Sequence, residues 1–80
     1  VKAAAQSAII EKIEEELTQE EHDIYRRGRN AHSPTMAKHA TMADYRRATG
    51  FEALMGYLYL KEDYERMITL VRKGIGEELL

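Results

Sequence analysis

The chain has 80 residues, a formal net charge of −2 and no cysteine. A chain of this length makes at most one domain and buries only about 60–65% of its extended surface. Without cysteine it has no disulfide and no thiolate metal site, and no apolar run approaches the roughly 20 residues that span a bilayer. No secretory leader is recognisable, so we expect a cytoplasmic protein with no membrane contact. Because the chain begins at Val1 rather than methionine, we expect residues upstream.

An amphipathic helix is predicted over about residues 3–17. Apolar residues recur there at four-residue steps through Ala5, Ile9, Ile13 and Leu17. Such a stripe on one helix face must pack against another element.

A second helix is predicted to begin at Thr18. Its hydroxyl and Glu21, three positions later, have the spacing of a capping box. Tyr25 supplies an apolar contact, and Gly28 is expected to loosen the backbone. The segment from Asn30 to Ala40 contains serine and proline and is predicted to be a loop.

Thr41 is predicted to cap a third helix that ends near Leu60, with Asp44 as its capping-box partner. This is the most apolar part of the chain, so we expect a central, buried helix. Gly50 and Gly56 weaken it, and each is expected to permit a bend or the close approach of a neighbouring backbone.

A fourth helix is predicted from Tyr64 to about Lys73, with Asp63 as its N-cap and Gly74 as its C-cap. Its apolar face is expected to comprise Tyr64, Met67, Ile68 and Val71. The chain is therefore predicted to be all-α, with about four helices.

Charge is segregated along the chain. Residues 11–23 hold seven acids against one lysine, whereas residues 26–47 hold six lysines and arginines against one aspartate. The local field rather than the net charge steers a polyanion. The pattern fits either two solvated helix faces or a basic surface that binds nucleic acid.

Glu52 is the strongest candidate for chemistry. Its helical neighbours one and two turns away are apolar or small, and none is a lysine or arginine: Tyr45, Ala48, Thr49, Met55, Gly56 and Tyr59. A buried carboxylate without a partner becomes protonated, pairs or binds a metal. The alternatives are an outward-pointing glutamate, or one paired with an arginine of another helix.

The basic residues are candidates for phosphate recognition, because a guanidinium offers a planar fork to phosphate oxygens. Arg26, Arg27, Arg29 and Asn30 cluster where a helix opens into a loop, and Arg46 and Arg47 begin the long helix. Favourable charge at a helix C-terminus also explains the first cluster. The histidines, His22, His32 and His39, lack metal-binding spacing and are expected at the surface.

Two segments resemble the Mini-ribonuclease III branch of the ribonuclease III family. They are Arg-Arg-Gly-Arg-Asn-Ala at residues 26–31 and Tyr-Arg-Arg-Ala-Thr-Gly-Phe-Glu-Ala-Leu-Met-Gly-Tyr-Leu-Tyr-Leu at residues 45–60. The second is similar to the Phe-Glu-Ala-Leu-x-Gly core of the wider family. In that family another acid stands three positions before the glutamate, where this chain has Thr49.

The resemblance implies a helical endoribonuclease domain that cuts double-stranded or structured RNA with Mg²⁺. It implies that Glu52 is catalytic and binds the metal. It also implies that Arg26, Arg27, Arg29 and Asn30, with Lys38 in the loop and Arg46 and Arg47 beyond it, contact RNA beside the metal site. A homodimer and a role in ribosomal RNA maturation are implied as well.

The family's Ile-Gly-Asp-Ala-like helix, with its catalytic aspartate, has no counterpart in residues 1–80. We therefore expect residues 1–80 to be the C-terminal part of the catalytic domain, without its N-terminal helices and without a double-stranded-RNA-binding domain, and inactive alone. The alternatives are a non-catalytic helical module that binds RNA or protein, and a helical interaction domain with no role in nucleic-acid binding.

Overall fold

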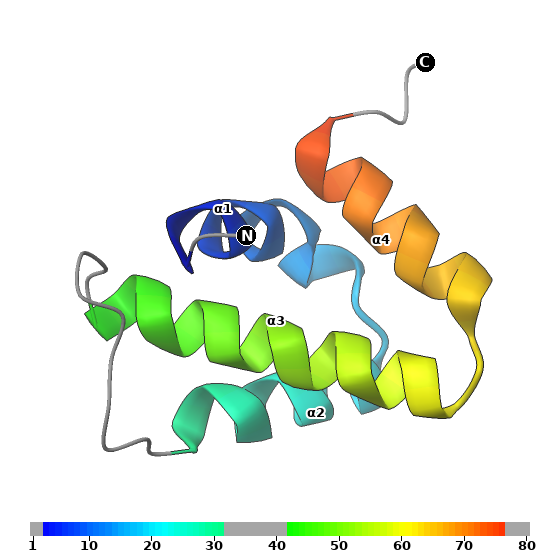
Figure 1. Ribbon diagram of the computed structural model, residues 1–80, viewed down its shortest axis with the longest axis horizontal. Coiled ribbons are helices and arrows are strands. Elements are labelled where there is room, and N and C mark those ends of the chain that lie inside the picture. Colours follow the sequence, from blue (N-terminus) through cyan, green and yellow to red (C-terminus); the bar gives the residue numbers. More distant parts are fainter. Residues whose placement is uncertain (1–2, 32–41, 77–80) are drawn as a thin grey trace.

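The computed structural model describes residues 3–31 and 42–76. These ranges form helices and contain no strand, which confirms the all-α prediction (Figure 1). The elements are α1 (Ala3–Ile13), the 3-10 turn η1 (Glu14–Glu16), α2 (Gln19–Asn30), α3 (Met42–Leu60) and α4 (Tyr64–Ile75). Of the loop predicted from Asn30 to Ala40, Asn30 is instead the last residue of α2. The rest of that loop beyond Ala31, including Lys38, and the predicted cap at Thr41 lie outside the described residues.

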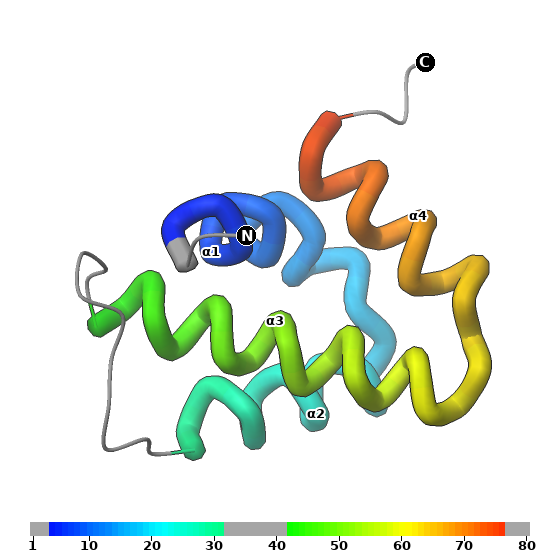
Figure 2. The backbone as a smooth tube through the Cα atoms, viewed as in Figure 1, coloured from blue at the N-terminus to red at the C-terminus, as the bar shows by residue number. Residues whose placement is uncertain are grey.

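Helix α3 is the centre of the fold. It packs against α1, α2 and α4, and α1 also packs against α4. Figures 1 and 2 show α1 and α4 along one side of α3 and α2 along the other. None of the helices in the described ranges is both long and apolar enough to cross a membrane.

The hydrophobic core draws on every α-helix. Its fully or nearly fully buried members are Ile10, Ile13, Tyr25, Phe51, Leu54, Leu58 and Leu70. Burying a side chain of this size contributes on the order of 2 kcal/mol. The prediction that α3 is central is confirmed, although Tyr59 and Leu60 at its end are exposed.

The first predicted helix is divided in two. Helix α1 ends at Ile13, η1 follows, and Leu17 has extended backbone angles. Of the predicted apolar stripe, Ile13 is buried and Ile9 and Leu17 are partly buried, but Ala5 is exposed. The buried side of α1 includes Ser7 and Ile10 instead, because it must face both α3 and α4.

Local capping chemistry sets the starts of α2 and α4 as predicted. The Glu21 backbone N–H donates to Thr18 Oγ1 at 3.1 Å, and the Thr18 N–H donates to Glu21 Oε1 at 2.9 Å. The Arg66 N–H donates to Asp63 Oδ1 at 3.3 Å. Each cap satisfies a backbone donor that has no partner within its helix.

Gly28 does not loosen α2, which continues through Asn30. A Cβ at Gly28 would lie 2.5 Å from Ala53 Cβ and 3.0 Å from Gly50 Cα. One at Gly50 would lie 2.7 Å from the Tyr25 carbonyl oxygen. The two glycines therefore permit a close crossing of α2 and α3, which confirms the prediction for Gly50 and corrects it for Gly28.

The end and the buried face of α4 also differ from prediction. Gly74 is not the C-cap but a buried residue within the helix, where an added Cβ would collide with Ile9 of α1. The cap is Gly76, whose φ of 81° is left-handed. Of the predicted apolar face, Met67 and Val71 pack against the core, but Tyr64 and Ile68 are exposed. Leu70 is fully buried instead, because the contact with α1 rotates α4 partly away from the predicted face.

Candidate functional site

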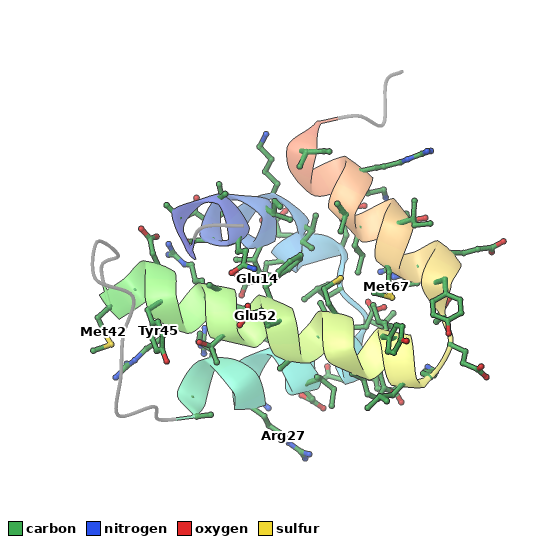
Figure 3. The ribbon with its side chains drawn as sticks, viewed as in Figure 1. Glu14, Arg27, Met42, Tyr45, Glu52 and Met67 are labelled. Atoms are coloured by element: carbon green, nitrogen blue, oxygen red, sulfur yellow. The ribbon has the colours of Figure 1, made fainter. Side chains whose placement is uncertain are left out.

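Glu52 projects from the middle of α3 and is exposed. Gln6 of α1 donates from its Nε2 to Glu52 Oε2 at 3.5 Å, a long and weak contact. The hypothesis of a buried carboxylate is therefore wrong for the described chain, and the outward-pointing alternative holds. The reason is geometric, since α1 and α4 cover one side of α3 and α2 the other, leaving a face open between them (Figure 3).

The open face of α3 is almost free of charge. Residues spaced alternately by three and four positions run along it, and we call them the open stripe of α3: Met42, Tyr45, Thr49, Glu52, Gly56 and Tyr59. Glu52 is the one charged member. Thr49, three positions before it, donates its hydroxyl to the Tyr45 carbonyl at 2.9 Å. Glu52 thus stands as a lone carboxylate on an apolar and small-residue surface.

The fit of this surface to a metal ion is partial. Within residues 3–31 and 42–76, no group of three or more histidine, cysteine, aspartate or glutamate side chains could hold a metal. Magnesium prefers six oxygen ligands, of which protein carboxylates usually supply one or two. Glu52 can provide one such ligand, so the part of the chain that the structure describes does not form a complete magnesium site.

The arginines at the end of α2 differ in how they are held. Arg26 Nη2 lies 3.1 Å from Asp23 Oδ1, and the Arg29 guanidinium lies 5.6 Å from the centroid of the Tyr25 ring. Arg27 has no ion-pair or hydrogen-bond partner among the residues described, and it is exposed. Asn30, the last residue of α2, is also exposed.

Of the two arginines at the start of α3, one is also held by another side chain and the other is not. Arg47 Nη1 lies 2.6 Å from Glu11 Oε1 and 3.4 Å from Ser7 Oγ, so this side chain ties α3 to α1. Arg46 is exposed and makes no such contact with the described part of the chain. Arg27 and Arg46 are therefore the predicted RNA-binding arginines whose donors have no partner within residues 3–31 and 42–76.

The structure does not bring Arg27 and Glu52 together. Figure 3 shows Arg27 projecting from α2 away from the bundle, whereas Glu52 lies on the central helix. Arg27 lines a surface groove with other α2 residues: Gln19, Glu20, Asp23 and Ile24. Arg27 therefore does not flank Glu52 within one copy of this chain, contrary to the arrangement that the resemblance implies.

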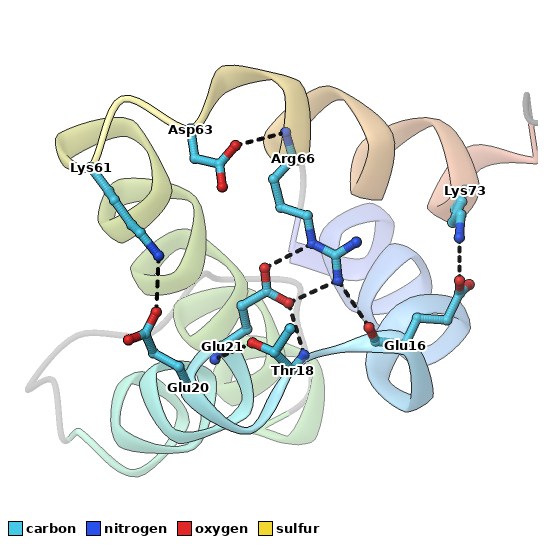
Figure 4. Close-up of polar contacts among 8 residues, drawn as sticks. All are labelled: Glu16, Thr18, Glu20, Glu21, Lys61, Asp63, Arg66 and Lys73. Atoms are coloured by element: carbon cyan, nitrogen blue, oxygen red, sulfur yellow. Dashed lines mark hydrogen bonds and ion pairs between the residues drawn. The ribbon is translucent and has the colours of Figure 1, made fainter.

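One strong electrostatic contact was missed by the sequence reasoning. Arg66 forms a two-pronged pair with Glu21: Nε lies 2.8 Å from Oε2, and Nη2 lies 2.9 Å from Oε1 (Figure 4). Nη2 also donates to the Glu16 carbonyl at 2.9 Å. Arg66 stands in the first turn of α4, where a cation opposes the helix dipole. That unfavourable position was the available indication that the residue has a specific partner.

The pKa of Glu21 reflects this contact. The hydrogen bonds from Arg66 lower the pKa of this carboxyl, burial opposes them, and the backbone N–H of Thr18 lowers it further. The same pair raises the pKa of Arg66. Glu21 is 4% exposed, so its negative charge is tolerated only because these donors replace water.

Comparison with known proteins supplies an independent line of evidence. The model of the family described as "Ribonuclease III domain" matches residues 1–63. The chain is 49% identical over 76 residues to Mini-ribonuclease 3 of Clostridium tetani, covering 95% of this chain and 50% of that protein. It is 51% identical over 73 residues to Mini-ribonuclease 3 of Streptococcus pneumoniae, covering 89% and 57%. The chain thus spans about half the length of these relatives.

Proposed function

The chain belongs to the ribonuclease III domain family, and from that premise we propose that it contributes Glu52 to the active site of a magnesium-dependent endoribonuclease. The observation that carries the proposal is the lone, exposed carboxylate of the open stripe, which lies within the matched residues 1–63. The proposed substrate is double-stranded or structured RNA, such as a ribosomal RNA precursor in the cytoplasm. The proposed active form is a homodimer.

In this proposal Glu52 supplies one oxygen ligand, and the other carboxylate comes from the part of the domain that this chain does not contain. Bound magnesium lowers the pKa of a coordinated water and neutralises charge that develops on the phosphodiester. The apolar and small neighbours of Glu52 favour this role, because no cation of the described chain shares its stripe and competes for the carboxylate.

The free arginines are proposed to bind the RNA backbone. A-form RNA is recognised largely by shape, through phosphate and 2′-hydroxyl contacts. Arg27 and Arg46 have donors for such contacts that no other residue of the described chain engages. Since Arg27 projects away from Glu52, we propose that it contacts RNA at a distance from the phosphodiester that is cut, or beside the site of another copy.

The test is the substitution Glu52→Gln in the complete domain. We expect cleavage of duplex RNA to fall by on the order of 10³-fold, the scale on which removal of one transition-state-stabilising group acts. RNA binding should persist, because the amide retains the size of the carboxyl. Glu65→Gln, at an exposed position of α4, is the matched control and should cleave normally. Unchanged cleavage by Glu52→Gln would overturn the proposal.

A non-catalytic RNA-binding module is the second candidate. It is favoured by the free arginines and by the absence of a complete metal-binding group within the described ranges. It requires Arg27 and Arg46 but tolerates Glu52→Gln. For residues 1–80 alone we expect no cleavage, since a single carboxylate holds magnesium weakly.

A further inference from the structure

Glu52 differs from the other glutamates that join separate parts of the fold. Four glutamates of the described chain each pair with a lysine or arginine from a distant part of the sequence. These pairs are Glu11 with Arg47, Glu16 with Lys73, Glu20 with Lys61 and Glu21 with Arg66. Glu52 instead accepts its hydrogen bond from the uncharged amide of Gln6. A lysine or arginine would neutralise the carboxylate, whereas an amide donor leaves its negative charge in place.

Gln6 engages one of the two oxygens of Glu52. Its Nε2 lies 3.5 Å from Oε2, and Oε1 has no hydrogen-bond partner within residues 3–31 and 42–76. Carboxylates that bind a metal are themselves hydrogen-bonded, and these partners orient the ligand and tune the affinity for the metal. Hydrogen bonds at active sites are often long in the free protein and shorten when the substrate binds. The contact therefore suits a donor that orients Glu52.

The backbone of Gln6 is fixed relative to α3. Ser7, the next residue of α1, is 2% exposed, and its Oγ lies 3.4 Å from Arg47 Nη1 of α3. One turn after Gln6, Ile10 is fully buried in the core. Because these contacts hold α1 against α3, the amide of Gln6 reaches Glu52 from a rigid helix and not from a loop.

The second glutamine of the chain makes a contact of a different origin. Gln19 also donates through Nε2 to a carboxylate, Asp23 Oδ1, at 3.1 Å. These two residues stand four positions apart on α2, so helical spacing alone brings them together. Gln6 and Glu52 stand 46 positions apart and meet only through the packing of α1 on α3. Gln19 is therefore a matched control for Gln6.

We propose that Gln6 is a positioning residue for Glu52. Its amide holds Oε2 and leaves Oε1, with the full charge of the carboxylate, for a divalent cation. The inference rests on the proposed function, in which Glu52 is a ligand of magnesium. Gln6 acts through Glu52 and contacts neither the metal nor the RNA.

The test is metal binding by the complete domain without RNA. Mn²⁺, a paramagnetic substitute for Mg²⁺, is titrated and followed by electron paramagnetic resonance. Gln6→Met keeps the length and helix propensity of glutamine but removes the donor. We expect Gln6→Met to weaken Mn²⁺ binding about tenfold, the scale on which loss of a hydrogen-bond partner of a metal ligand acts. Gln19→Met should bind Mn²⁺ as the unchanged protein does. An unchanged affinity for Gln6→Met would overturn the proposal.

Gln6→Lys tests whether the donor must be uncharged. Lysine restores a donor but adds an ammonium group that pairs with Glu52 and competes with the metal. We therefore expect Gln6→Lys to bind Mn²⁺ more weakly than Gln6→Met. If Gln6→Lys binds Mn²⁺ as tightly as the unchanged protein, the neutral amide has no special role and the proposal fails.

Two further measurements separate positioning from other roles. The contact is exposed and long, so Gln6→Met should melt within about 2 °C of Gln19→Met. A lower Tm with unchanged Mn²⁺ affinity would mean a structural role, and weaker RNA binding with unchanged Mn²⁺ affinity would mean a direct RNA contact. Either result overturns the proposal. If Glu52→Gln weakens Mn²⁺ binding but Gln6→Met does not, this inference alone fails. If Glu52→Gln leaves both Mn²⁺ binding and cleavage unchanged, the proposed function fails with it.

Discussion

Near the N-terminal end of α2 Glu21 is buried and paired, whereas near its C-terminal end Arg26 and Arg27 are exposed and Arg27 has no partner among the residues that the structure describes. Glu21 accepts hydrogen bonds from Thr18 and Arg66, and the pair joins α2 to α4. One and a half turns later Arg26 shares a weak surface pair with Asp23, and Arg27 pairs with no residue in the part of the chain that the structure describes. The two ends lie on the same helix, so the difference in burial and pairing of their charged side chains does not follow from helical propensity.

The comparison separates charges that build the fold from charges available to a ligand. A buried carboxylate must have its partners within the protein, since an unpaired one costs several kcal/mol. A side chain that binds phosphate must keep its donors free until the ligand arrives. Satisfaction of hydrogen bonds therefore distinguishes Glu21 and Arg66, which hold the helices together, from Arg27 and Arg46, which can bind a partner.

The largest effect is expected when the buried pair is broken. Arg66→Ala leaves Glu21 buried without its main partner and should lower the free energy of unfolding by about 3 kcal/mol. Urea denaturation of the complete domain measures the change. Lys73→Ala, which removes an exposed pair with Glu16, is the control and should cost less than about 1 kcal/mol. Equal losses for the two variants would contradict a structural role for the buried pair.

The starts of α2 and α4 could be predicted because capping is local. Thr18 with Glu21, and Asp63 before α4, are recognisable over four residues and mark both helix starts correctly. The rotation of α4 could not be predicted in this way. It depends on where Ile9 meets Gly74, a contact between residues 65 positions apart (74 − 9). The roles of Gly28 and Gly74 could not be predicted for the same reason. In sequence, a glycine at a helix crossing has the same appearance as a glycine at a flexible point or a C-cap.

The family could be predicted from the sequence, but the environment of its candidate residue, Glu52, could not. The Phe-Glu-Ala-Leu-Met-Gly segment points to Glu52 through its resemblance to a family, and that family is confirmed. Whether Glu52 is buried depends on which faces of α3 the other helices cover. Helices α1, α2 and α4 pack against α3 and leave one of its faces, which carries Glu52, uncovered. The pairing of Arg47 with Glu11, 36 positions earlier, likewise arises only when α1 and α3 pack together.

A second loss of stability, smaller than that caused by Arg66→Ala, is expected at acidic pH. The pKa of Glu21 is lowered on folding from its ordinary value of 4.5, mainly by the hydrogen bonds from Arg66. Because the folded pKa is the lower one, this contribution to stability is complete above the unfolded pKa. It is lost as the pH falls through the folded pKa.

The complete domain should therefore lose stability as the pH falls below about 4.5. Glu21→Gln should be less stable at neutral pH but should lose less stability on acidification. Urea denaturation at a series of pH values measures both. Glu20→Gln is the control, since the pKa of Glu20 is also lowered, by Tyr57 and Lys61, but at the surface. A steeper acid dependence for Glu21→Gln than for the unchanged protein would exclude this account.

The smallest effect is expected on RNA affinity, from substitutions near the C-terminal end of α2. If Arg27 neutralises one phosphate, Arg27→Ala should reduce the slope of log affinity for duplex RNA against log salt concentration by about 1. Arg26→Ala should change the slope less, because Asp23 already holds that guanidinium. Asp23→Asn then gives the sharper test. It releases Arg26 and removes a negative charge, so it should strengthen RNA binding and steepen the slope. Weaker binding by Asp23→Asn would show that the pair, and not the free guanidinium, is what the RNA requires.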